Sequence, residues 1–336
     1  MVNIRIAGEE RERQTLSEFA CLSCESKGRQ KYTPPCTLRT EFQRDRDRIT
    51  HSQSFRRLMN KTQVFLAPVG DHYRTRLTHT LEVTQIARTI ARALHLNEDL
   101  AEAAALGHDL GHTPFGHAGE RVMQECFSKD FTHSKQSLRV VDMLENDGEG
   151  LNLTYEVRDG IVNHTGDDKA ETLEGRIIKF ADRIAYINHD IDDAFRAGIL
   201  APEDLPRDII EILGDSHSQR INTMVTSVVK GSEGLNDILM VPEIGDAANR
   251  LREFLFEAVY RNPIAKGEEG KAQEMLARLY EYYVKNPDKL TGVYKKQLKT
   301  EPVERCVCDF VSGMSDRFAI ENYRKLFIPE VWRGLN

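Results

Sequence analysis

The chain of 336 residues is 40% hydrophobic and 29% charged and carries a formal net charge of −7. Its length allows a large core, its composition is that of an ordinary globular protein, and its acidity argues against a general nucleic-acid coat protein. No apolar run approaches the roughly 18 residues of a membrane span, and the N-terminus lacks the apolar stretch of a signal peptide, so we expect a cytoplasmic protein with no membrane partner.

Residues 1–38 form the first segment, and their polar composition and Pro-Pro pair predict irregular structure. Three of the six cysteines, Cys21, Cys24 and Cys36, lie in this segment. A zinc site here would need a fourth ligand such as His51, at a spacing unlike common zinc sites. We therefore interpret the cysteines as reduced, incidental thiols.

Residues 39–61 carry a local excess of positive charge. The basic residues are Arg39, Arg44, Arg46, Arg48, Arg56, Arg57 and Lys61, against the acidic Glu41, Asp45 and Asp47. Two interpretations have equal support. The segment is either an edge of the protein that handles anions, or a helix whose charges pair with one another at i, i+3 and i+4.

Further along, residues 62–65 favour a strand and residues 67–71 a turn. Thr78 is expected to cap a helix that begins at His79, and Asn97 to cap a helix over residues 98–110. Helical periodicity continues at 117–127, 133–146, 153–162, 172–198, 206–230, 245–260, 268–285 and 302–326. Since no strand–helix alternation appears, we predict an all-α fold with at most a few short strands.

The pair His108-Asp109 is the most informative feature of the sequence. Adjacent side chains on a helix point about a third of a turn apart, so both can reach one metal ion. His79 and Asp182, each inside an apolar helical pattern, complete a predicted set of four nitrogen and oxygen ligands with positions left open for water and a phosphate. The alternative is that the histidines are satisfied interior groups and Asp182 is a cap or a surface ion.

A second layer follows this pair. His112 lies four residues after His108, and His117 and Glu120 share one face of a new helix. A carboxylate that holds an imidazole is the usual support for a proton-transfer histidine, although Glu120 at a helix start could also serve as a simple cap.

Asp182, Tyr186 and Asp190 recur every four residues along the helix predicted at 172–198. This polar stripe either faces solvent or lines a polar pocket, because burying it without partners would cost about 1–3 kcal/mol per group. The metal hypothesis for Asp182 favours the pocket.

The ordered segments 39–49, 55–65, 75–79, 107–120, 181–190 and 313–318 resemble the HD-domain superfamily of metal-dependent phosphohydrolases, and within it the dGTPase-like deoxynucleoside triphosphate triphosphohydrolases. The resemblance implies an all-α HD fold with a catalytic core at 39–200 and a helical region at 201–336 packed on that core. Residues 59 and 60 depart from the pattern, which leaves the details near Gln63 open. The chain is also short for the group, which leaves the preferred base open.

The resemblance also implies an activity, namely cleavage of a dNTP to the deoxynucleoside and inorganic tripolyphosphate by a homo-oligomer. The metal would be Mn or Mg in the first place, with Fe, Co, Ni or Zn also compatible. His117, supported by Glu120, would assist the attack of water on the α-phosphorus. The implied substrate contacts are His112 and His133 at the α-phosphate, Arg76 at a phosphate, Gln63 and Asp190 at the sugar, and Tyr186 against the deoxyribose.

Two other functions stay open. The chain could be an HD phosphatase or phosphodiesterase for another nucleotide, which the metal ligands alone do not exclude. It could also be a non-catalytic nucleotide sensor or single-stranded DNA binder that uses residues 39–61, and either ligand could act as an effector of an enzyme.

Overall fold

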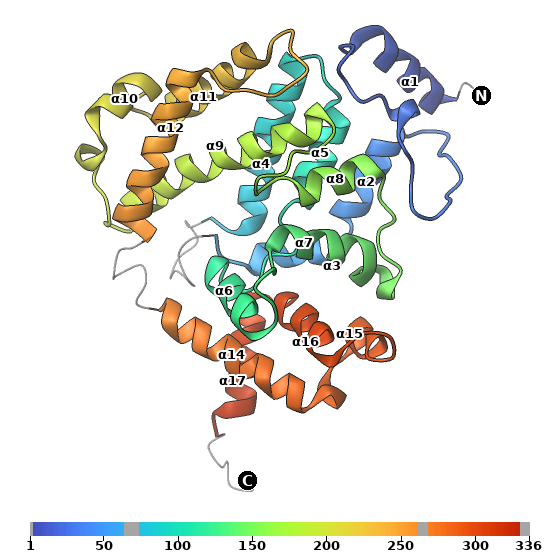
Figure 1. Cartoon of the computed structure of the whole chain (residues 1–336), viewed down its shortest axis with the longest axis vertical. Helices are drawn as coiled ribbons and strands as arrows, with labels where there is room; N and C mark the ends of the chain where they lie inside the picture. Colours follow the sequence, from blue (N-terminus) through green and yellow to red (C-terminus); the bar gives the residue numbers. More distant parts are fainter. Residues whose placement is uncertain (1–2, 64–73, 261–267, 330–336) are drawn as a thin grey trace, which may run out of the picture.

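The computed structural model describes residues 3–63, 74–260 and 268–329 (Figure 1). Helices account for the ordered structure of these ranges, and their only β pairings are two isolated bridges, Arg29 with Thr154 and Thr62 with Thr75. The predicted all-α fold is confirmed. Within the same ranges, no helix has both the length and the apolar character needed to cross a membrane.

The helices are α1 (Ile4–Thr15), α2 (Glu41–Thr50), α3 (Gln53–Arg57), α4 (Arg76–Ala93), α5 (Glu98–Gly107), α6 (His117–Cys126), α7 (His133–Arg139), α8 (Tyr155–Val162), α9 (Leu173–Arg196), α10 (Arg207–Leu213), α11 (His217–Ser232), α12 (Pro242–Leu255), α14 (Glu269–Lys285), α15 (Gly292–Gln297), α16 (Val303–Ser312) and α17 (Asp316–Phe327). Short π-helical turns follow α7 at Val140–Leu144 and α12 at Phe256–Tyr260.

The long helix α9 is the centre of the largest hydrophobic cluster. Ile177, Ile184 and Ile191 recur at every second turn and are fully buried, which gives α9 one continuous apolar face. Against this face pack α4 and α5 on one side and α11 and α12 on the other. The polar positions of α9 are therefore held in register by a well-packed apolar face.

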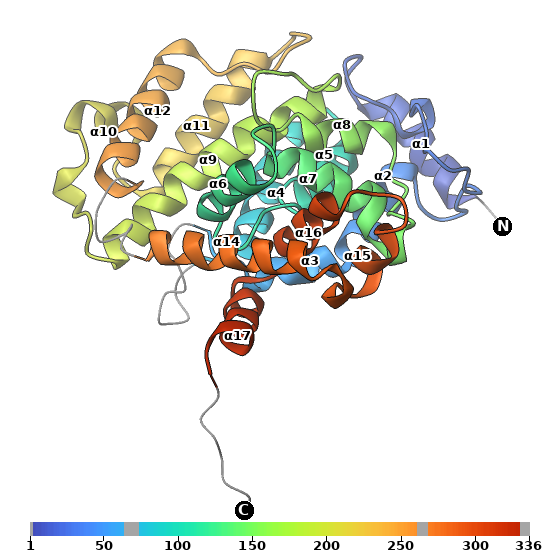
Figure 2. The ribbon, with the colours of Figure 1, turned by 60° about the horizontal axis from the view of Figure 1, so that its bottom comes forward.

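Two further clusters complete the body of the protein. One joins α2, α5 and α8, and the other joins α6 to α14, α16 and α17. Figures 1 and 2 show α14 to α17 together along one edge of the molecule, beside α6 and α7. The C-terminal helices thus share a core with the segment that follows His108-Asp109 in the sequence.

The prediction that residues 1–38 are irregular is wrong for α1. Asn3 caps this helix by accepting a hydrogen bond from the backbone of Ile6, and Arg5 pairs with Glu9 four residues on at 2.5 Å. No residue of α1 is fully buried. The helix consequently lacks the apolar stripe by which periodicity reveals a helix, and its local polar contacts replace that signal.

The predicted cap at Thr78 is also wrong, because α4 begins at Arg76 with Thr75 as its N-cap. The Thr75 hydroxyl accepts from the backbone N–H of Thr78 (3.4 Å), and the Thr78 hydroxyl accepts from that of Thr75 (3.0 Å). This reciprocal capping places Arg76 on the helix, one turn before His79 and on the same side.

Several predicted helices are shorter than expected or broken. The helix predicted at 98–110 ends at Gly107, and that at 133–146 gives way to the π-helical turn after α7. The helix predicted at 206–230 divides at Gly214, whose φ of +108° ends α10. That at 302–326 divides before Ser315, which caps α17, and that at 245–260 begins earlier, at Pro242. The other four predicted helices agree with α6, α8, α9 and α14 within two residues at each end.

The strand predicted at 62–65 is reduced to the single bridge of Thr62 with Thr75. Residues 64 and 65, and the predicted turn at 67–71, lie outside the described residues. All six cysteines are free thiols.

Most basic side chains of residues 39–61 have acidic partners. Arg44 lies 2.7 Å from Glu41 and Arg39 lies 2.5 Å from Asp47, while Arg46 lies 3.4 Å from Asp99 on α5. These contacts favour the interpretation of a salt-bridged helix. A cavity of about 370 Å³ nevertheless opens beside α2, and its lining includes Arg39, Arg44, Arg48 and His51.

Two buried charges tie the turn after His108-Asp109 to the C-terminal helices. The Lys61 ammonium is 2% exposed and donates to the backbone carbonyls of His112 and, at 3.0 Å, of Ser312. The carboxylate of Asp316 accepts from the backbone of Phe115 at 3.0 Å and from the backbone and hydroxyl of Thr62 at 2.9 and 2.7 Å. Residues between 201 and 254 positions apart in sequence are thereby fixed to one another.

We predict that Asp316→Ala lowers the free energy of unfolding by about 2–4 kcal/mol, because it leaves the buried backbone donor of Phe115 and two donors of the partly buried Thr62 without an acceptor. Asp316→Asn keeps one carbonyl oxygen and should lose about half as much. Urea unfolding measures both, with Asp288→Ala as the control at a side chain that is 69% exposed. Equal stability of the Asp316→Ala and Asp288→Ala proteins would contradict the structural role of Asp316.

Candidate metal centre and active site

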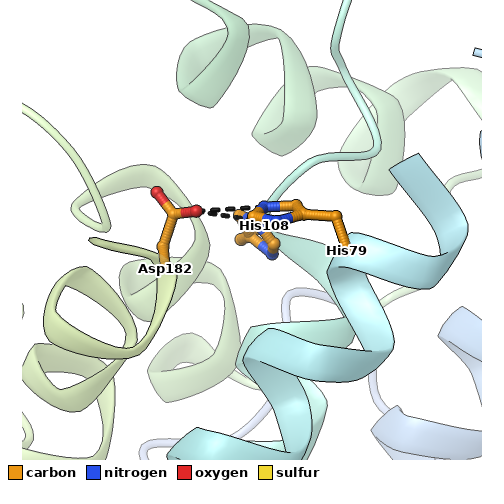
Figure 3. Close-up of side chains that lie close together, drawn as sticks. All are labelled: His79, His108 and Asp182. Atoms are coloured by element: carbon orange, nitrogen blue, oxygen red, sulfur yellow. Dashed lines mark ion pairs between the residues drawn. The ribbon is translucent and has the colours of Figure 1, made fainter. Parts of the chain in front are cut away.

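Three of the four predicted metal ligands converge on one point. His79 comes from the second turn of α4, His108 directly follows α5, and Asp182 lies in the middle of α9 (Figure 3). Their ligand atoms all lie within 4.8 Å of one another. Asp182 Oδ1 is 3.0 Å from His79 Nε2 and 3.9 Å from His108 Nε2. The three segments meet because α9 packs against α4 and α5.

The donor atoms of this group suit a divalent metal. His108 Nδ1 lies 2.6 Å from the carbonyl of Ala105, which can only accept, so the ring proton is on Nδ1 and Nε2 keeps its lone pair. His108 Nε2 is buried and has no hydrogen-bond partner in the part of the chain that the structure describes. Burial alone would raise the pKa of Asp182, but the His79 hydrogen bond and the imidazoles lower that pKa to about 2, so the carboxylate is ionised. Two imidazoles with carboxylate oxygen are a typical ligand set for Mn, Fe, Co, Ni or Zn.

Asp109, the fourth predicted ligand, borders this group. Its Oδ1 is 3.5 Å from His108 Nε2, and its Oδ2 is 3.9 Å from His79 Nε2. Arg76, predicted to bind a phosphate, donates to Asp109 Oδ2 at 2.7 Å and is 2% exposed. Although burial opposes ionisation, the charges of neighbouring groups, the Arg76 guanidinium among them, hold the pKa of Asp109 well below its usual value. Arg76 therefore keeps this carboxylate charged at the edge of the candidate metal site.

The predicted contact of His117 with Glu120 is present, and Glu120 holds a second histidine as well. Its Oε2 is 3.0 Å from His117 Nδ1, while its Oε1 lies 3.1 Å from His133 Nδ1. These hydrogen bonds lower the pKa of Glu120 despite its burial. The His117 side chain is 69% exposed, unlike the other histidines around it, so it is the one that can reach an incoming molecule.

His112 is buried and stacks on His133, with the ring centroids 4.1 Å apart. Burial and the positive charge of Arg76 hold the pKa of His112 well below its usual value, so this imidazole is neutral. Its Nδ1 has no hydrogen-bond partner in the described structure. The pKa of His133, in contrast, is raised by its hydrogen bond to Glu120 in spite of burial.

The stripe on α9 faces the interior. Asp190 is 1% exposed, and burial together with the nearby Asp193 and Asp182 raises its pKa well above the usual value. Among the described residues, its buried Oδ1 has no hydrogen-bond partner, and neither does the buried Oε1 of Gln63. Tyr186 is partly buried against the core, and burial raises its pKa. The interpretation of a solvent-facing stripe is therefore wrong, at Asp190 above all.

Two histidines of this region were not predicted from the sequence. His164 follows α8 and is 1% exposed; its ring lies 5.0 Å from that of His108, and burial lowers its pKa to about 3. His189 Nε2 lies 2.9 Å from Glu82 Oε2, and the His189 ring lies 5.8 Å from that of His79. The one available signal for His164 was its position two residues after the end of α8, which is similar to the position of His108 after α5.

Comparison with known proteins agrees with this geometry. Residues 76–187 match the HD domain, and residues 238–325 match the phosphohydrolase-associated domain. A deoxyguanosinetriphosphate triphosphohydrolase-like protein of Caldanaerobacter subterraneus subsp. tengcongensis is 54% identical over 331 residues, which cover 98% of each chain. A protein of the same name from Desulfatibacillum aliphaticivorans is 51% identical over 347 residues, covering 98% of this chain and 99% of that protein.

The chain belongs to the deoxyguanosinetriphosphate triphosphohydrolase-like family of HD-domain proteins. The resemblance drawn from the sequence is thus confirmed, and this family member is an HD-type phosphohydrolase. The crystal structure of a phosphohydrolase from Bacteroides thetaiotaomicron shares the fold with a TM-score of 0.53 at 18% identity, over 84% of this chain and 68% of that one. The segment of this chain that matches the HD domain contains His79, His108 and Asp182, whose ligand atoms lie close together.

We predict that Asp182→Ala weakens binding of Mn²⁺ by more than about 100-fold, because it removes the carboxylate that two imidazoles face. Bound metal is measured by elemental analysis after dialysis against Mn²⁺ and by calorimetric titration. Asp192→Ala on the same helix serves as the matched control, since Asp192 pairs with Arg74 and with His217, which is not a proposed metal ligand. Unchanged affinity in the Asp182→Ala protein would remove Asp182 from the metal site.

Proposed function

We propose that the protein is a dNTP triphosphohydrolase that cleaves a deoxynucleoside triphosphate to the deoxynucleoside and inorganic tripolyphosphate. The observation that carries this proposal is the convergence of His79, His108 and Asp182 beside the exposed imidazole of His117. The names of the relatives, which are similar over nearly their full length, point to the same reaction class. We further propose a cytoplasmic homo-oligomer that contributes to control of the dNTP pool.

His79, His108, Asp109 and Asp182 would hold the metal, with Mn or Mg proposed first and Fe, Co, Ni or Zn compatible with the imidazoles. When bound, a divalent ion supplies Lewis-acid polarisation of a phosphate oxygen and lowers the pKa of a water molecule. Arg76 contributes by keeping Asp109 ionised at 2.7 Å. Its guanidinium Nε has no partner in the described structure, so it retains a donor for a phosphate oxygen.

His117 is proposed as the group that assists the attack of water on the α-phosphorus. Because the Glu120 carboxylate accepts from His117 Nδ1, the neutral ring keeps a lone pair on Nε2, which can take a proton from water. Glu120 stabilises the imidazolium that results. The bond between the α-phosphorus and the 5′ oxygen then breaks, and a proton must return to that oxygen as the deoxynucleoside leaves.

The remaining substrate contacts are proposals with a common basis, which is that each side chain lies at or beside this buried polar region. His112 and His133 would face the α-phosphate, and Gln63 and Asp190 would bind the sugar through the atoms that lack partners. Tyr186 would pack against the deoxyribose, where a 2′-hydroxyl would collide with the ring. The base preference follows from none of these contacts.

The direct test is product identification. The purified protein is incubated with each dNTP, alone and mixed, with Mn²⁺ or Mg²⁺, and we expect release of tripolyphosphate and deoxynucleoside from at least one of them. The ribonucleotides serve as the control and should be cleaved much more slowly. Release of only monophosphate or pyrophosphate would refute the proposed reaction and favour an HD phosphatase or phosphodiesterase.

His117→Ala should reduce kcat by about 10²–10⁴-fold while leaving the content of bound metal unchanged, because His117 acts on the proton and not on the ion. Steady-state kinetics and elemental analysis of the same preparation measure the two effects. His95→Asn, at an exposed histidine of the turn after α4, is the control. Loss of metal in the His117→Ala protein would show that His117 is a ligand.

We also propose that the cavity beside α2 is where an anionic effector, a nucleotide or single-stranded DNA, would bind. Arg39, Arg44 and Arg48 line it with a net positive charge that the single carboxylate of Asp47 only partly offsets. This is the observation that favours an effector at residues 39–61, although most of their charges pair internally.

A further inference from the structure

The turn that leads to His117 has a strained backbone. Phe115 has a φ of +60° and Gly116 a φ of +56°, directly before the first residue of α6. The left-handed region is unfavourable for a bulky side chain such as that of phenylalanine, so the surrounding structure must hold this conformation. Because the two residues lead straight into His117, their backbone decides where α6 begins and where its first side chain points.

Asp316, the first residue of α17, supplies one of the contacts that hold this turn. Its Oδ1 accepts from the backbone N–H of Phe115 at 3.0 Å. The ring of Phe115 is buried in the cluster that joins α6 to α14, α16 and α17. Thr113 closes the turn from within, since its hydroxyl donates to the carbonyl of Gly116 at 2.8 Å. The strained conformation before His117 therefore depends on the C-terminal helices.

The second oxygen of the same carboxylate holds a different segment. Asp316 Oδ2 accepts from the backbone N–H of Thr62 at 2.9 Å and from the Thr62 hydroxyl at 2.7 Å. Thr62 also pairs with Thr75, the N-cap of α4, and is followed in the chain by Gln63, the proposed sugar contact. One buried carboxylate thus connects the residue before Gln63 with the residue two positions before His117.

The surroundings of Gly116 show that these two segments lie against each other. A Cβ added at Gly116 would lie 2.9 Å from Arg76 Nη2 and 3.4 Å from the backbone carbonyl oxygen of Gln63. Arg76 in turn donates to Asp109 at 2.7 Å. The turn and the segment of Gln63 are therefore as close as a glycine allows, and a displacement of either one would disturb the contacts of the other.

We propose that Asp316 is a positioning residue, which sets the separation between Gln63 and His117 by holding Thr62 with one carboxylate oxygen and Phe115 with the other. The proposal rests on the function proposed above, in which Gln63 contacts the sugar and His117 assists the attack of water. Asp316 lies in the region that matches the phosphohydrolase-associated domain. This region then takes part in substrate binding and catalysis, in addition to its contribution to stability.

The first test separates KM from kcat in the full-length protein with Mn²⁺ and a dNTP that the unmodified protein cleaves. Asp316→Asn keeps the size of the side chain but replaces one acceptor oxygen with a donor group. We expect KM to rise about fivefold through Gln63, and kcat to fall about 10–100-fold through His117. An Asp316→Asn protein with native circular dichroism, in which either constant is unchanged, would overturn the proposal.

Thr62 offers a milder change with a conservative partner. Thr62→Val keeps the shape of the side chain and removes only the hydroxyl bond to Asp316, so we expect KM to rise about threefold and kcat to stay within about twofold. Thr62→Ser keeps the hydroxyl and should behave like the unmodified protein. Thr300→Val, at an exposed threonine whose hydroxyl donates within its own turn, is the control. Equal KM values in Thr62→Ser and Thr62→Val would contradict the role of this bond.

A double-mutant cycle shows whether Thr62 acts through Gln63. In a Gln63→Ala background the effect of Thr62→Val on KM should disappear, because the side chain whose position it sets is absent. A rise of KM by the same factor in both backgrounds would show that Thr62 acts independently of Gln63, and would refute the proposal.

Hydrogen exchange measured by mass spectrometry distinguishes this proposal from the proposed reaction, because it needs no substrate. The amide hydrogens of Thr62 and Phe115 should exchange about tenfold faster or more in Asp316→Asn than in the unmodified protein. Equal exchange in the two proteins would refute the role of Asp316 whatever nucleotide is cleaved. Faster exchange in Asp316→Asn, together with failure of the unmodified protein to cleave any dNTP, would instead refute only the proposed substrate.

Discussion

The candidate site depends on one constraint, which is that the Nδ1 atoms of four of its histidines are already engaged. His108 and His164 each face a backbone carbonyl one helical turn earlier, and His117 and His133 share the carboxylate of Glu120. Each neutral ring is thereby left with a lone pair on Nε2. The helices α5, α6, α7 and α8 can then each present an Nε2 lone pair to the same region of the protein. Two of the four rings share a single carboxylate, so the site does not need a separate acceptor side chain for each histidine.

This constraint requires a rigid frame, because a misplaced turn would rotate the rings. At Gly111 an added Cβ would lie 2.1 Å from the backbone nitrogen of Ser137, so only glycine lets α7 approach the turn after α5. The Ser137 hydroxyl uses this proximity and joins Gly111 N at 2.9 Å to the His108 carbonyl at 2.7 Å. On the other side, buried Asp309 on α16 accepts from Gln136 on α7 at 2.8 Å. The histidines are thus positioned from both sides.

The sequence predicted those parts of the site whose partners are close along the chain. His108-Asp109 and His117 with Glu120 are neighbours in sequence, and Asp182, Tyr186 and Asp190 reveal themselves by helical spacing. His164 was not predicted, because only its closeness in space to His133, 31 residues earlier in the chain, places it at the site. The predicted roles of all these residues remain predictions, as do the domain limits at 38/39 and 200/201.

The fold was predicted where apolar periodicity is strong, as along α9, and mispredicted where local polar contacts decide. The helix α1 has no buried face, and the start of α4 depends on which of two threonines caps it. The breaks at Gly214 and Ser315 interrupt patterns whose apolar residues continue on both sides. Periodicity reports which residues face a core and is insensitive to a short interruption between two helices that share one.

The hydrogen bond between Asp316 and Phe115 spans 201 positions of the chain. At about 5–20 residues per second, a ribosome needs roughly 10–40 s to synthesise that interval. During this time the histidine-bearing turn has been made, but the carboxylate and the helices that hold it have not. A nascent chain therefore carries every candidate metal ligand well before the geometry that would orient them exists, and the chemistry of the site begins only when synthesis is almost complete.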